Sequence, residues 1–95
     1  MRRESMSPER AETLALEALG WLAGDAAAIG RFLGLSGMDA ADLKAAAGSR
    51  DTAAAVVDFL LGDEELLLRF CAETGTPPEA LHRAQYLLGG TVGPD

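Results

Sequence analysis

The feature that most constrains the fold is a segment that repeats 38 residues later along the chain. Residues 18–46, aligned with residues 56–84, give eight identities in 29 positions. The matched positions are Leu22 with Leu60, Gly24-Asp25 with Gly62-Asp63, Arg31-Phe32 with Arg69-Phe70, Gly37 with Gly75, Leu43 with Leu81, and Ala46 with Ala84. This repeat predicts a three-helix unit present twice, at about 8–47 and 49–88, with the two halves packed about a pseudo-twofold axis.

Each Gly-Asp step predicts a tight corner between two helices. A glycine can adopt the left-handed conformation that closes a helix, and an aspartate can cap the next helix by accepting backbone N–H bonds. The other expected helix starts are at Ser7, Asp39, Ser49 or Asp51, and Thr76. Ala, Leu and Glu dominate the composition, which favours helix over strand. We therefore predict an all-α fold, a compact bundle of about six short helices, with the fourth and fifth helices forming much of its centre.

The chain length of 95 residues is enough for one domain and not for two. We expect a single helical domain at residues 7–90, an N-terminal tail at residues 1–6 and a C-terminal tail at residues 91–95. No apolar stretch approaches the ~20 residues of a membrane span, and the N-terminus has no signal-peptide pattern. The lone cysteine, Cys71, cannot form an internal disulfide, so we expect a cytoplasmic protein.

The chain is acidic, with a formal net charge of −7 from 15 acidic and 8 basic residues. Nucleic-acid binding draws much of its affinity from Lys and Arg side chains that neutralise phosphates, and anionic membranes attract basic segments. The sequence therefore predicts no nucleic-acid partner and no membrane partner. The charge is typical of a soluble protein, and it would also suit a basic protein partner.

Candidate catalytic residues are few. Cys71 and His82 are the one possible nucleophile–base pair, but Cys71 falls on the apolar side of its helix, which predicts a small core residue. We expect His82 at the edge of the core or in solvent. One histidine and one cysteine cannot build a zinc site within one chain, and Asp63-Glu64-Glu65 suits the first turn of a helix better than a cation site. We therefore predict a non-enzyme with no catalytic, cofactor-binding or metal-ligating residue.

Arg31 and Arg69 each lie six residues after a corner aspartate, beside a phenylalanine. One interpretation is that each arginine satisfies carbonyl groups at a helix end or pairs with an acid of the other half. The alternative is a matched pair that binds an acidic partner across the pseudo-twofold axis. Both interpretations are open from the sequence alone.

Several motifs resemble a known family. These are Leu60-Leu61-Gly62-Asp63-Glu64, Ala18-Leu19-Gly20-Trp21-Leu22, Arg31-Phe32-Leu33 and Pro77-Pro78-Glu79-Ala80-Leu81. Over about 12–88, the chain is similar to the domain of unknown function 3572 family of short bacterial proteins. The resemblance implies a bacterial cytoplasmic protein, and it carries no catalytic or binding residue over to this sequence.

Two functions remain as hypotheses. The first is a non-enzymatic protein-interaction or regulatory module, since helical surfaces rich in Ala and Leu offer grooves for a partner. The alternative is a protein that binds a small apolar ligand in a cavity between the two halves, near Trp21, Phe32, Phe59 and Phe70. A homodimer is also possible, because the fourth and fifth helices carry more apolar surface than a small bundle hides.

Overall fold

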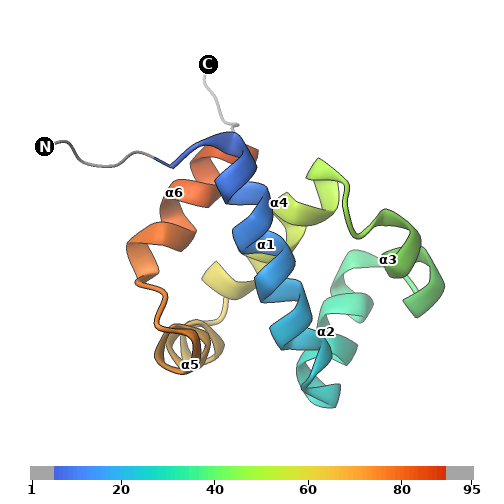
Figure 1. The fold of residues 1–95 in the computed structure, drawn as a ribbon. Coiled ribbons are helices and arrows are strands. Elements are labelled where there is room, and N and C mark those ends of the chain that lie inside the picture. Colours follow the sequence, from blue (N-terminus) through green and yellow to red (C-terminus); the bar gives the residue numbers. More distant parts are fainter. Residues whose placement is uncertain (1–5, 90–95) are drawn as a thin grey trace, which may run out of the picture.

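The computed structural model describes residues 6–89, which form six α-helices joined by short connections (Figure 1). The helices are α1 (Pro8–Ala23), α2 (Ala26–Ser36), α3 (Ala40–Ala46), α4 (Arg50–Leu61), α5 (Glu64–Thr74) and α6 (Pro78–Leu88). This confirms the prediction of an all-α bundle of about six short helices. The tails predicted at residues 1–6 and 91–95 lie outside the described residues, except for Met6, which packs against the core.

Five of the six helices begin at a predicted cap. The side chains of Ser7, Asp25, Asp39, Ser49 and Asp63 each accept a hydrogen bond from the backbone N–H three residues later. The predicted Thr76 cap is wrong. Pro77 occupies the N-cap position of α6 without a side-chain hydrogen bond, and the Thr76 hydroxyl lies 2.9 Å from the Thr74 hydroxyl instead. The two consecutive prolines start the helix through their restricted backbone, one residue later than Thr76 could cap it.

The centre of the bundle consists of α1, α4 and α6, which pack against one another, while α2 packs on α1 and α5 packs on α4. The prediction that the fourth and fifth helices form the centre is correct for α4 and wrong for α5. Helix α5 buries Leu66, Leu67 and Phe70 on one side, and Leu68 on another side is exposed. The small and branched side chains of α4 instead allow α1 and α6 to approach it closely. The residues that α4 buries are Thr52, Ala53, Val56, Val57 and Leu60.

The two Gly-Asp corners have the same backbone conformation. Gly24 and Gly62 have φ angles of −80° and −83°, and the aspartates that follow them have φ angles of −124° and −133°. The expected left-handed closure is therefore absent from these corner glycines. A Cβ atom on Gly62 would lie 3.3 Å from the Asp58 carbonyl oxygen, so close approach favours glycine there. The left-handed conformation occurs at Gly37 and Gly75, with φ angles of 76° and 75°.

The two halves differ in their third helix. Helix α6 has 11 residues, buries Leu81, Ala84 and Leu88, and packs against both α1 and α4. Helix α3 has 7 residues, buries Leu43 alone, and lies on the far side of the molecule from α6 (Figure 1). The corners and second helices therefore match in the two halves, and the third helices occupy unlike places.

Candidate functional site

Two ion pairs cross between the halves and define the first candidate site. Arg31 of α2 pairs with Asp63, the cap of α5, while Arg69 of α5 pairs with Asp25, the cap of α2, at 2.7 Å. Each guanidinium also lies over an aromatic ring: Arg31 Cζ is 5.5 Å from the ring centroid of Phe59, and Arg69 Cζ is 5.4 Å from that of Trp21. The structure thus supports the interpretation in which each arginine pairs with an acid of the other half.

Each corner aspartate has two roles in this site. The first oxygen of Asp25 accepts the Ala28 N–H at 3.1 Å, and its second oxygen accepts Arg69. The Ala28 N–H and then the Arg69 guanidinium hold the pKa of Asp25 below its ordinary value of 3.8. The Arg31 guanidinium and then the Leu66 N–H lower the pKa of Asp63 in the same way. Both carboxylates stay charged at neutral pH, so the arginine charges are locally neutralised.

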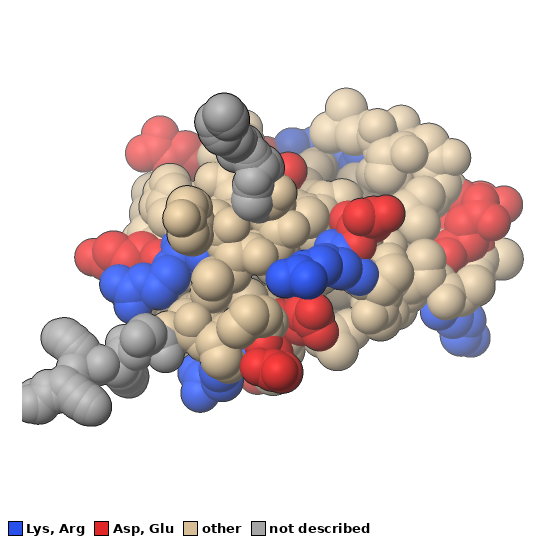
Figure 2. All heavy atoms as spheres, turned by 90° about the horizontal axis from the view of Figure 1, so that it is seen from above, with Lys and Arg blue, Asp and Glu red and all other residues tan. Residues whose placement is uncertain are grey.

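The surface charge on one face of the molecule is mixed rather than segregated (Figure 2). On the face shown in Figure 2, basic and acidic side chains are interspersed, and the basic ones do not join into a continuous area. This distribution gives that face little affinity for an acidic partner.

The four aromatic side chains near the crossed pairs pack edge to face. Trp21 contacts Phe70 and Phe32 contacts Phe59, each with ring centroids 5.4 Å apart. Phe32 and Phe70 are fully buried. A hollow of about 220 Å³ lies between α2 and α5, but it is open to solvent and is lined by the four charged side chains of the crossed pairs. This packing argues against an apolar ligand cavity among the four rings.

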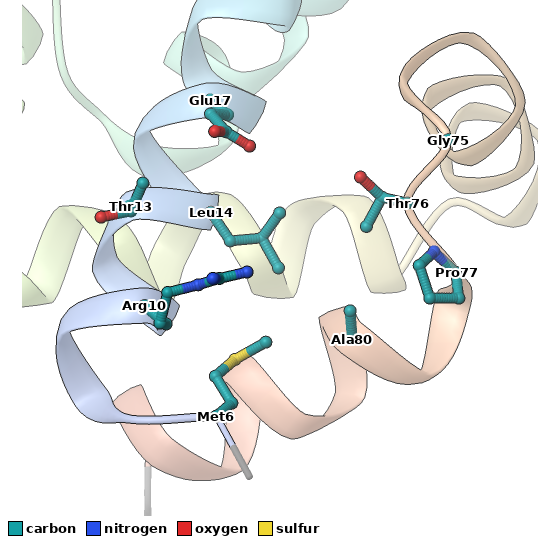
Figure 3. Close-up of a pocket in the computed structure, with 9 residues that line it drawn as sticks. All are labelled: Met6, Arg10, Thr13, Leu14, Glu17, Gly75, Thr76, Pro77 and Ala80. Carbon is teal, nitrogen blue, oxygen red and sulfur yellow. The ribbon is translucent and has the colours of Figure 1, made fainter. Parts of the chain in front are cut away.

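A larger hollow lies between α1 and the connection from α5 to α6, and we name it the α1 hollow (Figure 3). Its volume is about 430 Å³. Its lining residues are Met6, Arg10, Thr13, Leu14, Glu17, Gly75, Thr76, Pro77 and Ala80. The buried side chain of Leu14 and the half-buried side chains of Met6 and Ala80 give it an apolar floor. Arg10 and Glu17 extend from α1 toward the opposite wall.

The α1 hollow follows from the helical spacing of its residues. Positions 10, 13, 14 and 17 recur every three or four residues, so they share one face of α1. Positions 20, 21 and 24 continue this face into an adjacent open hollow that Arg69 and Glu73 also line. There, the Trp21 indole N–H donates to the Glu73 carboxylate at 2.8 Å. Arg10, Thr13 and Glu17 were not predicted as site residues, although their spacing places them beside the apolar face of α1.

Cys71 and His82, the one possible nucleophile–base pair in the sequence, lie on different helices, α5 and α6. Cys71 is half-buried in α5, where burial and then the Glu79 carboxylate raise the pKa of its thiol above the ordinary value. His82 is exposed on α6. Asp63 caps α5, as its position predicted. Within residues 6–89, no group of three or more His, Cys, Asp or Glu side chains is placed to hold a metal ion.

Comparison with known proteins places the chain in a family. Residues 8–91 match the family model described as "Protein of unknown function (DUF3572)". The chain belongs to the DUF3572 family. The motifs that resembled this family thus lie in a true member, and the match covers all six helices of the DUF3572 chain. Searches of curated proteins and of solved structures gave no significant match. None of the helices in the described part of the chain combines the length and apolar character that crossing a membrane requires.

Proposed function

We propose that this DUF3572 protein is a non-enzymatic interaction module of the bacterial cytoplasm that binds a segment of another protein in the α1 hollow. The observation that carries the proposal is the composition of this hollow. The apolar side chain of Leu14 lies between a cationic side chain, Arg10, and an anionic one, Glu17, and faces the apolar Ala80 on the opposite wall. Protein-binding sites combine such an apolar centre with a polar rim.

Size and charge support this assignment. The volume of about 430 Å³ lies within the range of ~300–1,000 Å³ that is usual for ligand pockets. The ion pairs among the described residues are Arg31–Asp63 and Arg69–Asp25, so within residues 6–89 neither Arg10 nor Glu17 has a charged partner. A partner segment could therefore pair with both groups without first breaking an ion pair among these residues.

The chemistry of Cys71 and His82 supports a non-enzymatic role. A raised thiol pKa reduces the thiolate fraction at neutral pH, and the thiolate is the nucleophile in cysteine catalysis. An exposed histidine without an orienting hydrogen bond among the described residues lacks the support that a catalytic base usually has. The acidic clusters serve as helix caps and first-turn residues.

The test is to fill the hollow. Thr13→Trp places a large ring at its exposed edge, and Ala45→Trp places the same ring on α3, at the other end of the molecule. Each immobilised chain is exposed to extract of its native cells, and the retained proteins are quantified by mass spectrometry. We expect a protein that both the native chain and Ala45→Trp retain and that Thr13→Trp loses by about tenfold or more. If Thr13→Trp retains every such protein while circular dichroism shows it folded, the proposed function is wrong.

A further inference from the structure

The α1 hollow has a direction, because Arg10 and Glu17, which form no ion pair within residues 6–89, lie at opposite ends of one helix face. Arg10, Leu14 and Glu17 form a stripe on α1, and the seven residue steps from Arg10 to Glu17 correspond to a rise of ~10 Å. The opposite wall, from Gly75 to Ala80, contributes no charged residue to the lining. The electrostatic polarity of the hollow therefore comes from α1 alone.

A second carboxylate adds negative charge near the Glu17 end of the hollow. Glu73 accepts a hydrogen bond from the Trp21 indole and lines the adjacent hollow, which lies further along α1 beyond Glu17. The opposite end has Arg10 together with the apolar side chain of Met6. A basic group thus fits near Glu17, and an acidic group fits near Arg10.

The spacing of the stripe matches a chain in extended conformation. In a strand, side chains at positions i, i+2 and i+4 point to one side and span ~13 Å in total. The ~13 Å span of the strand exceeds the ~10 Å span from Arg10 to Glu17 by about 3 Å, and long charged side chains can bridge this difference. An extended segment can therefore place its middle side chain over Leu14 while its outer ones reach Glu17 and Arg10.

We infer that the α1 hollow binds an extended segment with the pattern basic, any, apolar, any, acidic, where the basic residue pairs with Glu17 and the acidic residue with Arg10. This inference rests on the proposed function and specifies the chemistry of the bound segment. The Thr13 hydroxyl donates to the Glu9 carbonyl at 3.0 Å and points away from the hollow, so the bound segment is recognised through Leu14 and the two charged side chains (Figure 3).

The probes are three pentapeptides with acetylated and amidated ends, so that only side chains carry charge. They are Lys-Ala-Leu-Ala-Glu, the doubly basic Lys-Ala-Leu-Ala-Lys and the doubly acidic Glu-Ala-Leu-Ala-Glu. Each is titrated into the full chain at low salt, where exposed charges are little screened, and binding is followed by NMR. We expect the mixed peptide to bind two- to fivefold more tightly than either of the others, the change that one exposed ion pair produces.

Charge reversal in the protein must move this preference. Arg10→Glu should bind the doubly basic peptide best, and Glu17→Arg should bind the doubly acidic peptide best. The matched control is Arg83→Glu on α6, an exposed residue outside the hollow lining, which should keep the preference of the native chain.

Equal binding of all three peptides, no binding of the mixed peptide at millimolar concentration, or the same preference in Arg10→Glu as in the native chain would overturn the inference. These outcomes are separable from failure of the proposed function. If Thr13→Trp loses a cellular partner while the peptides show no charge preference, the hollow is an interaction site of different chemistry. If Thr13→Trp keeps every partner, the proposed function itself fails.

Discussion

Phe32 and Phe70 occupy matching places in the two halves, so truncating either should be costly. Both are fully buried, and each makes an edge-to-face contact with an aromatic ring from the opposite half. Replacing a buried phenylalanine with alanine costs about 3–5 kcal/mol, which includes the cavity left behind. The free energy of unfolding of a chain of 95 residues is ~5–14 kcal/mol, so Phe32→Ala and Phe70→Ala should each remove a large fraction of it.

Urea unfolding followed by circular dichroism measures this cost, and it avoids fluorescence because Phe70 contacts the single tryptophan. The control is Leu35→Ala on α2, a side chain that is 77% exposed, for which we expect a change within ~0.5 kcal/mol. We expect the two phenylalanine variants to agree within ~1 kcal/mol. If one costs over 3 kcal/mol and the other under 1 kcal/mol, the two corners are not energetically equivalent, and the reasoning from the repeat fails.

The remaining predictions concern the corners and the helix ends. Asp25 and Asp63 have lowered pKa values in the folded chain, so the stability they contribute is present above pH 3.8 and is lost as the pH falls through the folded pKa. Asp25→Asn should therefore show a smaller fall in the urea midpoint between pH 5 and pH 2 than the native chain; an equal fall would exclude this linkage. Gly75→Ala should destabilise by roughly 1–2 kcal/mol because of its positive φ. Gly34→Ala, in open space on α2, should stabilise by up to ~1 kcal/mol, and a loss there in thermal unfolding would contradict the helix-propensity argument.

The helix starts were predictable because capping is local chemistry. The side chains of Ser7, Asp25 and Asp63 each bond a backbone N–H three residues away, so the sequence pattern contains both partners. The exception, Thr76, shows the limit of this approach. The same residue type can cap a following helix or bond to the end of the preceding one, and the two prolines decide between these outcomes.

Which acid each arginine pairs with was not predictable from the sequence, although pairing with an acid of the other half was one of the two interpretations. Arg31 and Asp63 are 32 residues apart, and their contact exists because the N-terminal parts of α2 and α5 face each other across one hollow. The position of α5 outside the centre was also missed, because its run of leucines is rich in apolar residues on more than one side. Which helices occupy the centre depends on how all six pack together, and that cannot be read from one helix alone. In this chain α6, rather than α5, packs against both α1 and α4.

The α1 hollow lies between α1 of the first half and the connection from α5 to α6 of the second half, and the repeat diverges at this connection. Thr76 and Pro77 of the second half correspond to Met38 and Asp39 of the first. Met38 packs against the core and Asp39 forms a capping box with Asp42, so that connection is held to its own helix. The shorter Thr76 and the uncapped Pro77 leave space against α1, and Arg10 and Glu17 reach into it. The repeated corners thus give both halves the same joint, while the divergent connection of the second half forms one wall of the α1 hollow.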